Sequence, residues 1–132
     1  MKKLIILFLC TVSLATAQQK TAAAEVVQKQ VEAYNARNIE AFIATYSDDV
    51  VFYGFPKEVR FKGIAQVREI FGIFFKNSPD LHCDIEDRIA SGDTVIDHEK
   101  VRFQKDDPIQ EFVVMYKVTD GKIQEVYFLK RP

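Results

Sequence analysis

Four strand-like segments follow one another in the second half of the chain, and they limit the possible folds more than any other feature. They span residues 81–90, 94–103, 110–118 and 122–130. Ser91-Gly92-Asp93 and Asp120-Gly121 are typical of tight turns between antiparallel strands. Residues 105–108 form a looser connection. This half of the chain is therefore predicted to be an antiparallel meander.

The first half is predicted to be mainly helical. Val27, Val31 and Tyr34 recur at helical spacing and indicate an amphipathic helix over residues 22–36. Asn38 can cap a second helix. The further predictions are a helix over 39–46, strands over 50–55 and 58–61, and a helix over 64–76. Helices first and a meander last indicate an α+β fold rather than a parallel sheet.

The N-terminus has the layout of a secretory signal peptide. Lys2 and Lys3 precede an apolar run over residues 4–14, and Ala15-Thr16-Ala17 offers small residues for cleavage. The run is too short to span a membrane. We therefore expect residues 1–17 to be removed and residues 18–132 to form one exported domain. The pattern looks bacterial, so the expected destination is the periplasm or the exterior.

The mature chain offers little electrostatic or metal chemistry. Cleavage removes 17 of 132 residues and two of 18 basic ones, which leaves 16 basic and 19 acidic residues and a formal charge of −3. Neither nucleic acid nor an anionic membrane is an expected partner. Cys83 is the one remaining cysteine, so no intramolecular disulfide is possible. His82 and His98 are expected on opposite faces of the sheet. No metal site and no cofactor are predicted, because nucleotide-binding motifs are also missing.

The alternation of side chains along the predicted strands indicates one polar pair, Asp87 and His98. Along residues 83–89 the alternate side chains are apolar except for Asp87, and burying an unpaired carboxylate is costly. A two-residue turn at Gly92-Asp93 places Asp87 opposite His98. We expect this pair to face the interior, where it could perform acid–base chemistry or bind a polar ligand. The alternatives are that the two residues only satisfy each other, or that a one-residue slip turns both outward.

The chain resembles the nuclear transport factor 2-like superfamily, and most closely its SnoaL-like and ketosteroid-isomerase branch. The stretches that carry the likeness are AYNARNIEAFIATYSDDVVFYGFP, FKGIAQVREIF, IASGDTVI and YKVTDGKIQEVYFL, in the family's order. The resemblance implies a cone-shaped fold, with three N-terminal helices packed on a curved, mainly antiparallel sheet around a pocket. It also implies a homodimer, but no particular reaction.

The residues that the isomerases use do not occur at the matching positions. The catalytic base would fall at Gly54 or Phe55, the oxyanion-hole tyrosine at Gln30 and its aspartate partner at Val113. Proton abstraction beside a ketone needs a base and strong donors, so steroid isomerisation is not expected.

Further residues are candidates for binding a small molecule. The resemblance places Ile96 and His98 at the pocket, in agreement with the predicted pairing. The complete set of ligand-binding candidates is Gln30, Tyr34, Tyr53, Phe55, Ile96, Lys100, Val113 and Met115. For the tyrosines the alternative is ordinary core packing, and for Lys100 it is a solvated strand end.

Three functions remain open. The first is an exported module that binds a small, largely apolar molecule. The second is an acid–base enzyme of the isomerase, cyclase or dehydratase type that uses Asp87 and His98. The third is a non-catalytic interaction protein, whose pocket is plugged by aromatic side chains and whose outer sheet face forms a dimer.

Overall fold

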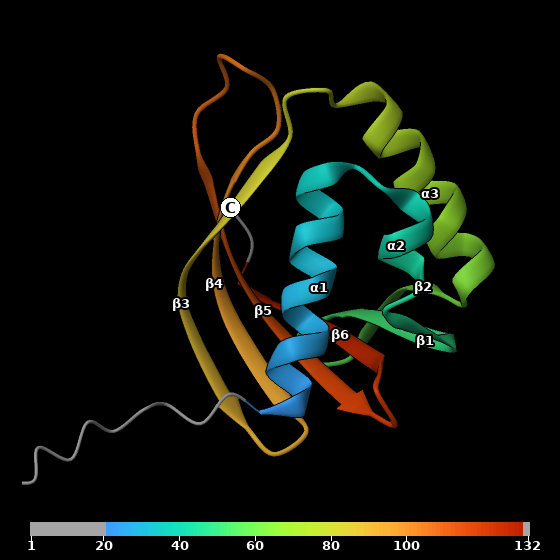
Figure 1. Ribbon diagram of the computed structural model, residues 1–132. Coiled ribbons are helices and arrows are strands. Elements are labelled where there is room, and N and C mark those ends of the chain that lie inside the picture. Colours follow the sequence, from blue (N-terminus) through green and yellow to red (C-terminus); the bar gives the residue numbers. More distant parts are fainter. Residues whose placement is uncertain (1–20, 131–132) are drawn as a thin grey trace, which may run out of the picture.

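A computed structural model describes residues 21–130 as a curved six-stranded sheet with helices on one face (Figure 1). The helices are α1 (Ala22–Ala36), α2 (Ile39–Ile43) and α3 (Ile64–Asn77). The strands are β1 (Tyr46–Gly54), β2 (Glu58–Lys62), β3 (His82–Ser91), β4 (Thr94–Arg102), β5 (Gln110–Thr119) and β6 (Lys122–Lys130). The predicted α+β class is confirmed. The predicted signal peptide lies outside the described residues.

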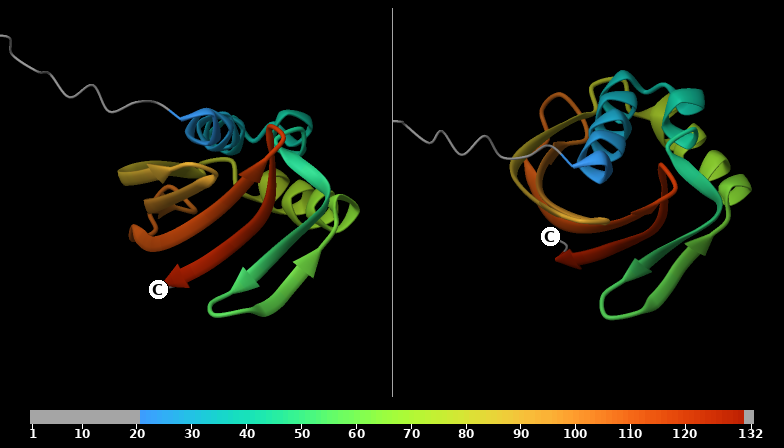
Figure 2. Two further views of the ribbon diagram at one scale, coloured as in Figure 1. Left: turned by 90° about the horizontal axis from the view of Figure 1, so that it is seen from below. Right: turned by 60° about the horizontal axis from the view of Figure 1, so that its bottom comes forward.

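The sheet has the order β2-β1-β6-β5-β4-β3. All neighbouring strands are antiparallel except β1 and β6, which run parallel. Figure 2 shows the sheet curling around α1, with α3 beyond it over β1 and β2. The helices cover the concave face only. The opposite face, called the outer face below, carries no helix in the described part of the chain.

Capping residues fix the ends of the first two helices. The hydroxyl of Thr21 accepts a hydrogen bond from the backbone N–H of Ala24, at 3.1 Å, and begins α1. Arg37 ends it in a left-handed conformation. The side chain of Asn38 accepts from the N–H of Ala41 and begins α2, as predicted.

One predicted boundary is wrong. The second helix was expected to continue to Tyr46, but α2 ends at Ile43 and Tyr46 already belongs to β1. The reason is pairing with the last strand, because the N–H of Ile123 donates to the carbonyl of Thr45 at 2.8 Å. This long-range hydrogen bond overrides the local helical pattern.

Aromatic side chains fill the space between the helices and β1. The ring of Phe42 is fully buried and lies 4.7–5.2 Å, centroid to centroid, from the rings of Phe71, Phe75 and Tyr46. Edge-to-face pairs of this kind add to the burial energy. This cluster holds α2 and α3 against the sheet and forms one side of the cavity described below.

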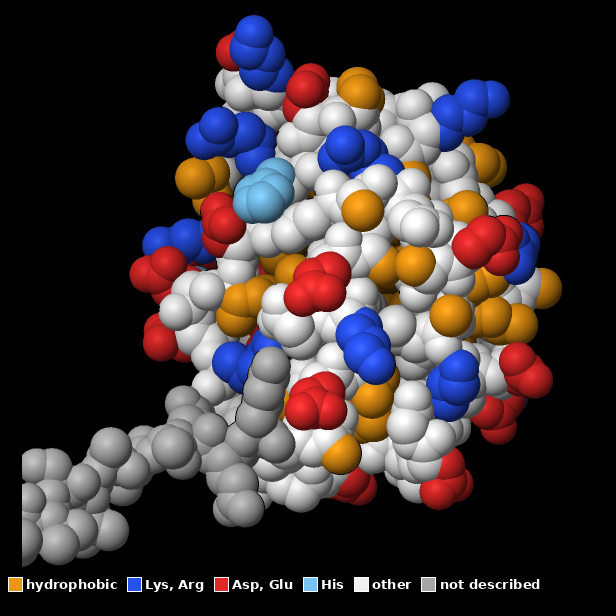
Figure 3. Space-filling view, viewed as in Figure 1, with side chains coloured by type: hydrophobic (Ala, Val, Ile, Leu, Met, Phe, Trp, Pro, Cys, Tyr) orange, Lys and Arg blue, Asp and Glu red, His pale blue; other side chains and the backbone are white. Residues whose placement is uncertain are grey.

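The surface carries both signs of charge. On the face shown in Figure 3, acidic and basic side chains are interspersed, without a continuous patch of one sign. No helix among the described residues is both long enough and apolar enough to cross a membrane.

Candidate functional site

A β-bulge in β3 decides which side chains face the helices. Asp87 pairs with His98 in the predicted register, and Ile89 pairs with Ile96. Between Ile85 and Asp87, however, the register shifts, so Glu86 is an extra residue. A bulge inverts the alternation beyond it. Odd-numbered residues of β3 therefore face the helices before the bulge, and even-numbered residues face them after it.

Asp87 and His98 consequently point away from the cavity, and their predicted inward orientation is wrong. Cys83, before the bulge, is buried, whereas Asp87, after it, is exposed. His98 Nε2 lies 3.2 Å from Glu111 Oε2 on the outer face. No hydrogen bond joins the described side chains of Asp87 and His98. The pairing of Asp87 with His98 was predicted correctly. The predicted orientation is wrong because it assumes that inward and outward side chains alternate along β3 without a bulge.

Six of the eight ligand-binding candidates also lie away from the cavity. Ile96, Val113 and Met115 share the outer face with His98, and the ring of Tyr53 stacks there on that of Tyr127, with centroids 4.7 Å apart. Lys100 and Phe55 complete these six. Lys100 Nζ pairs with Glu86 at 3.1 Å, and Phe55 is 63% exposed after β1.

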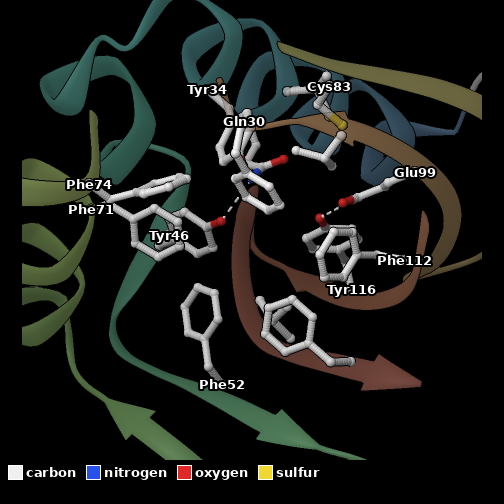
Figure 4. Close-up of a pocket in the computed structure, with 15 residues that line it drawn as sticks. Gln30, Tyr34, Tyr46, Phe52, Phe71, Phe74, Cys83, Glu99, Phe112 and Tyr116 are labelled. Atoms are coloured by element: carbon white, nitrogen blue, oxygen red, sulfur yellow. Dashed lines mark hydrogen bonds between the residues drawn. The ribbon is translucent and has the colours of Figure 1, made fainter. Parts of the chain in front are cut away.

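Gln30 and Tyr34, one helical turn apart on α1, do line a cavity between the sheet and the helices (Figure 4). The cavity has a volume of about 250 Å³. Its wall is mostly aromatic, and the lining residues are Gln30, Val31, Tyr34, Tyr46, Phe52, Phe71, Phe74, Cys83, Glu99, Val101, Phe103, Phe112, Tyr116, Val126 and Phe128. Phe74, Phe112 and Tyr116, which could have plugged the cone, form part of the wall.

Glu99 supplies the one carboxyl group among these lining residues. It projects from β4, and the hydroxyl of Tyr116 on β5 donates to its Oε1 at 2.7 Å. Burial raises the pKa of Glu99 to about 7, partly opposed by that hydrogen bond. A glutamic acid in this state can both take up and release a proton near neutral pH.

Arg88, the cation whose charge lowers the pKa of Glu99, is already paired with another carboxylate. Arg88 donates through Nε and Nη2 to the two oxygens of Asp97, at 2.6 and 2.8 Å. Its Nη1 donates to Gln28 on α1. Asp97 is fully buried, and this two-pronged contact satisfies it. Arg88 therefore does not neutralise Glu99 directly.

A second polar pair lies at the cavity (Figure 4). Gln30 Nε2 on α1 donates to the hydroxyl of Tyr46 on β1, at 3.1 Å. Gln30 is only 6% exposed, and its Oε1 accepts no hydrogen bond from any described residue. A buried acceptor without a donor is unfavourable, so a molecule that donates to it would be stabilised here. Burial also raises the pKa of Tyr34, which therefore stays neutral.

Sequence reasoning missed Glu99 and Asp97, and it did not place their row of β4 on the inner face of the sheet. The sequence does contain an indication of the inward row, because Val95, Asp97, Glu99 and Val101 are alternate residues of one strand and therefore share a face. Both valines are buried. The competing row of Ile96, His98 and Lys100 faces inward only if the alternation of β3 runs unbroken from Cys83 to the turn. A row that begins and ends in valine indicates the buried face of β4 better than the predicted pairing with β3 does.

A sequence-family model described as a SnoaL-like domain matches residues 27–126. The chain belongs to the SnoaL-like family. This membership confirms the predicted resemblance and covers α1 through most of β6. No curated protein is detectably similar to this SnoaL-like chain in sequence.

Solved structures share the fold of this SnoaL-like chain at low identity. An uncharacterised cystatin-fold protein from Novosphingobium aromaticivorans is 22% identical, with a TM-score of 0.74 over 83% of this chain and 99% of that one. A putative ketosteroid isomerase from Kribbella flavida is 20% identical, with a TM-score of 0.67 over 84% and 80%. A putative polyketide cyclase from Sinorhizobium meliloti is 15% identical, with a TM-score of 0.67 over 80% and 94%.

Metal chemistry has no obvious location in residues 21–130. No group of three or more histidine, cysteine, aspartate or glutamate side chains comes together there in a way that could hold an ion. Cys83 is a free, buried thiol, and burial raises its pKa. A thiol in this environment is a poor nucleophile.

Proposed function

We propose that this SnoaL-like chain binds a small, largely apolar molecule that carries one polar group. The observation that carries the proposal is the cavity of about 250 Å³ with a mainly aromatic wall and two polar pairs. Cavities of this composition are typical of small-molecule sites. The apolar wall would hold the body of the ligand, and Glu99, Gln30 and Tyr46 would orient its polar end.

The volume limits the size of the ligand. An apolar cavity of roughly 150 Å³ is enough for benzene, and drug-sized molecules occupy roughly 300–1,000 Å³. The cavity here lies between these values. We therefore expect a molecule with one or two rings, or an aliphatic chain of similar bulk, rather than a four-ring steroid.

A pair of matched variants tests the binding proposal. Val101 lines the cavity, whereas Val113 lies on the outer face of the neighbouring strand. Native mass spectrometry of residues 18–132 would detect a co-purified molecule, and NMR titration with 2-phenylethanol would measure binding of a one-ring probe. We expect Val101→Phe to abolish binding and Val113→Phe to leave it intact. Equal binding by both folded variants would refute the cavity as the site.

Acid–base catalysis is a second candidate, and the pKa of about 7 for Glu99 favours it. Two of the structurally similar proteins are named as a putative ketosteroid isomerase and a putative polyketide cyclase. Glu99 would take the proton of a carbon acid beside a carbonyl group. Exchange of the α-protons of 2-tetralone in D₂O, followed by NMR, tests this role. Exchange that is equally fast with the wild type and with Glu99→Gln would exclude Glu99 as the base.

A further inference from the structure

The charge balance of the cavity points to the chemistry of its ligand. Glu99 is acidic, and the lining residues among those described include no lysine, arginine or histidine. Arg88, whose charge acts on Glu99, contacts both oxygens of Asp97. An ionised Glu99 therefore has a hydrogen bond from Tyr116 but no ion-pair partner among residues 21–130. An ionised carboxylate buried in this way is unfavourable without an opposite charge.

The groups around Glu99 do not change this balance. Those that face it from every neighbouring element are Tyr116 on β5, Asp97 on β4, Arg88 and Cys83 on β3, Tyr34 on α1 and Tyr46 on β1. Burial raises the pKa of the tyrosines and of the thiol, so these stay neutral around pH 7. The aspartate and the arginine form an ion pair. Among these described groups, an ionised Glu99 is the one charge without an ion-pair partner.

The remaining features of the wall favour a positive ligand over a neutral one. Nine of the fifteen lining residues are phenylalanine or tyrosine, and the faces of aromatic rings attract cations. The free Oε1 of Gln30 is an acceptor and needs a donor from the ligand. An ammonium group has three N–H donors and no acceptor, so it matches both Gln30 and Glu99. A carboxylate or phosphate ligand would meet Glu99 without a compensating cation.

We infer that the ligand is a small organic cation, a protonated amine on an apolar body of one or two rings, with its ammonium group paired to Glu99. This inference rests on the proposed function and specifies its ligand class. Binding would drive the ionisation of Glu99 and release a proton when the free carboxyl is protonated. Affinity for the amine would therefore fall as the pH drops below the pKa of the free site.

Three isosteric probes separate the ligand classes: 2-phenylethylamine, 2-phenylethanol and phenylacetate. Isothermal titration calorimetry at pH 7.5 on residues 18–132 would measure each. We expect the amine to bind at least tenfold more tightly than the alcohol, and phenylacetate to bind most weakly. With a pKa of about 7 for Glu99, the amine should bind roughly 25-fold more weakly at pH 5.5 than at pH 7.5, because an alkylammonium stays protonated throughout.

Two variants assign the preference to the cavity. Glu99→Gln is expected to remove the advantage of the amine and its pH dependence while retaining the alcohol. Glu111→Gln neutralises a carboxylate on the outer face and should leave the preference unchanged, with circular dichroism as the check on folding. Binding of the alcohol at least as tight as that of the amine in the wild type would overturn the inference and leave the proposed function intact. Failure of every probe to bind would instead refute the proposed function.

Discussion

Glu99 links the chemistry of the cavity to the stability of the fold. Its burial raises its pKa from 4.5 to about 7. The folded protein therefore binds a proton more tightly at this site than the unfolded chain does. Stability from this group is fully present below pH 4.5, and it is lost as the pH rises from there through 7.

Replacing Glu99 with glutamine should remove this pH dependence. Between pH 5 and pH 8 the wild type is expected to lose about 2–3 kcal/mol of unfolding free energy relative to Glu99→Gln, since each pKa unit corresponds to about 1.4 kcal/mol. Urea denaturation at both pH values measures the difference. Glu111→Gln, at an exposed carboxylate, is the control and should follow the wild type. Parallel behaviour of the wild type and Glu99→Gln would show that the carboxyl is not buried.

At the scale of elements, Asn35 attaches α1 to the edge strand β3. Its side chain accepts from the N–H of Cys83 at 2.7 Å and donates to the carbonyl of the same residue at 2.9 Å. This contact satisfies backbone groups on the open edge of β3, where unpaired groups could recruit another strand. It also fixes the helix that carries Gln30 and Tyr34 at a set position over the cavity.

Asn35→Ala is expected to lower the unfolding free energy by about 1–2 kcal/mol, because two backbone groups lose their partner. Amide hydrogen exchange should show loss of protection at Cys83 in particular. Asn77→Ala, an exposed asparagine at the end of α3, serves as the control. Unchanged protection at Cys83 in Asn35→Ala would mean that the strand edge does not need this side chain.

The positions of the helices and strands were largely predictable from sequence. Which side chains of β3 and β4 face the helices was not. The helix over residues 22–36 and the turn at Gly92-Asp93 follow from local spacing and turn chemistry, and both agree with the structure. No residue in the sequence marks the bulge at Glu86, which is seen only in the pairing of β3 with β4. Because of this one extra residue, Asp87 and His98 face outward, and Asp97 and Glu99 face the helices instead. The site depends on this kind of long-range detail more than the fold does.

For the whole molecule, we predict removal of the N-terminal segment on export. Residues 1–17 have the charge, apolar core and small-residue ending of a signal peptide. Expression of the full chain in a Gram-negative host, followed by cell fractionation and intact mass measurement, should yield a periplasmic protein that starts at Gln18. Ala17→Arg is expected to block processing. A full-length cytoplasmic product from the unaltered chain would contradict the prediction.

The outer face of the sheet carries a continuous apolar row. Ile89, Ile96, Met115, Tyr127 and Tyr53 are paired neighbours from β3 across to β1. Lys117 on β5 and Glu125 on β6 are paired beside this row. A two-fold axis between these two strands would place Lys117 of each copy opposite Glu125 of the other. Such an axis would bring the two apolar rows together and set opposite charges beside them, as an isologous dimer requires.

We predict a homodimer through this row. Light scattering coupled to gel filtration should give twice the monomer mass. The double change Ile89→Glu and Ile96→Glu should give the monomer, because each copy would then bury two carboxylates against the apolar row of the other without opposite charges. Ile70→Glu with Ile73→Glu is the matched control. These two isoleucines are 39% and 58% exposed on α3, away from the outer face. If the α3 variant dissociates and the sheet variant does not, the dimer uses the helical side and the prediction is wrong.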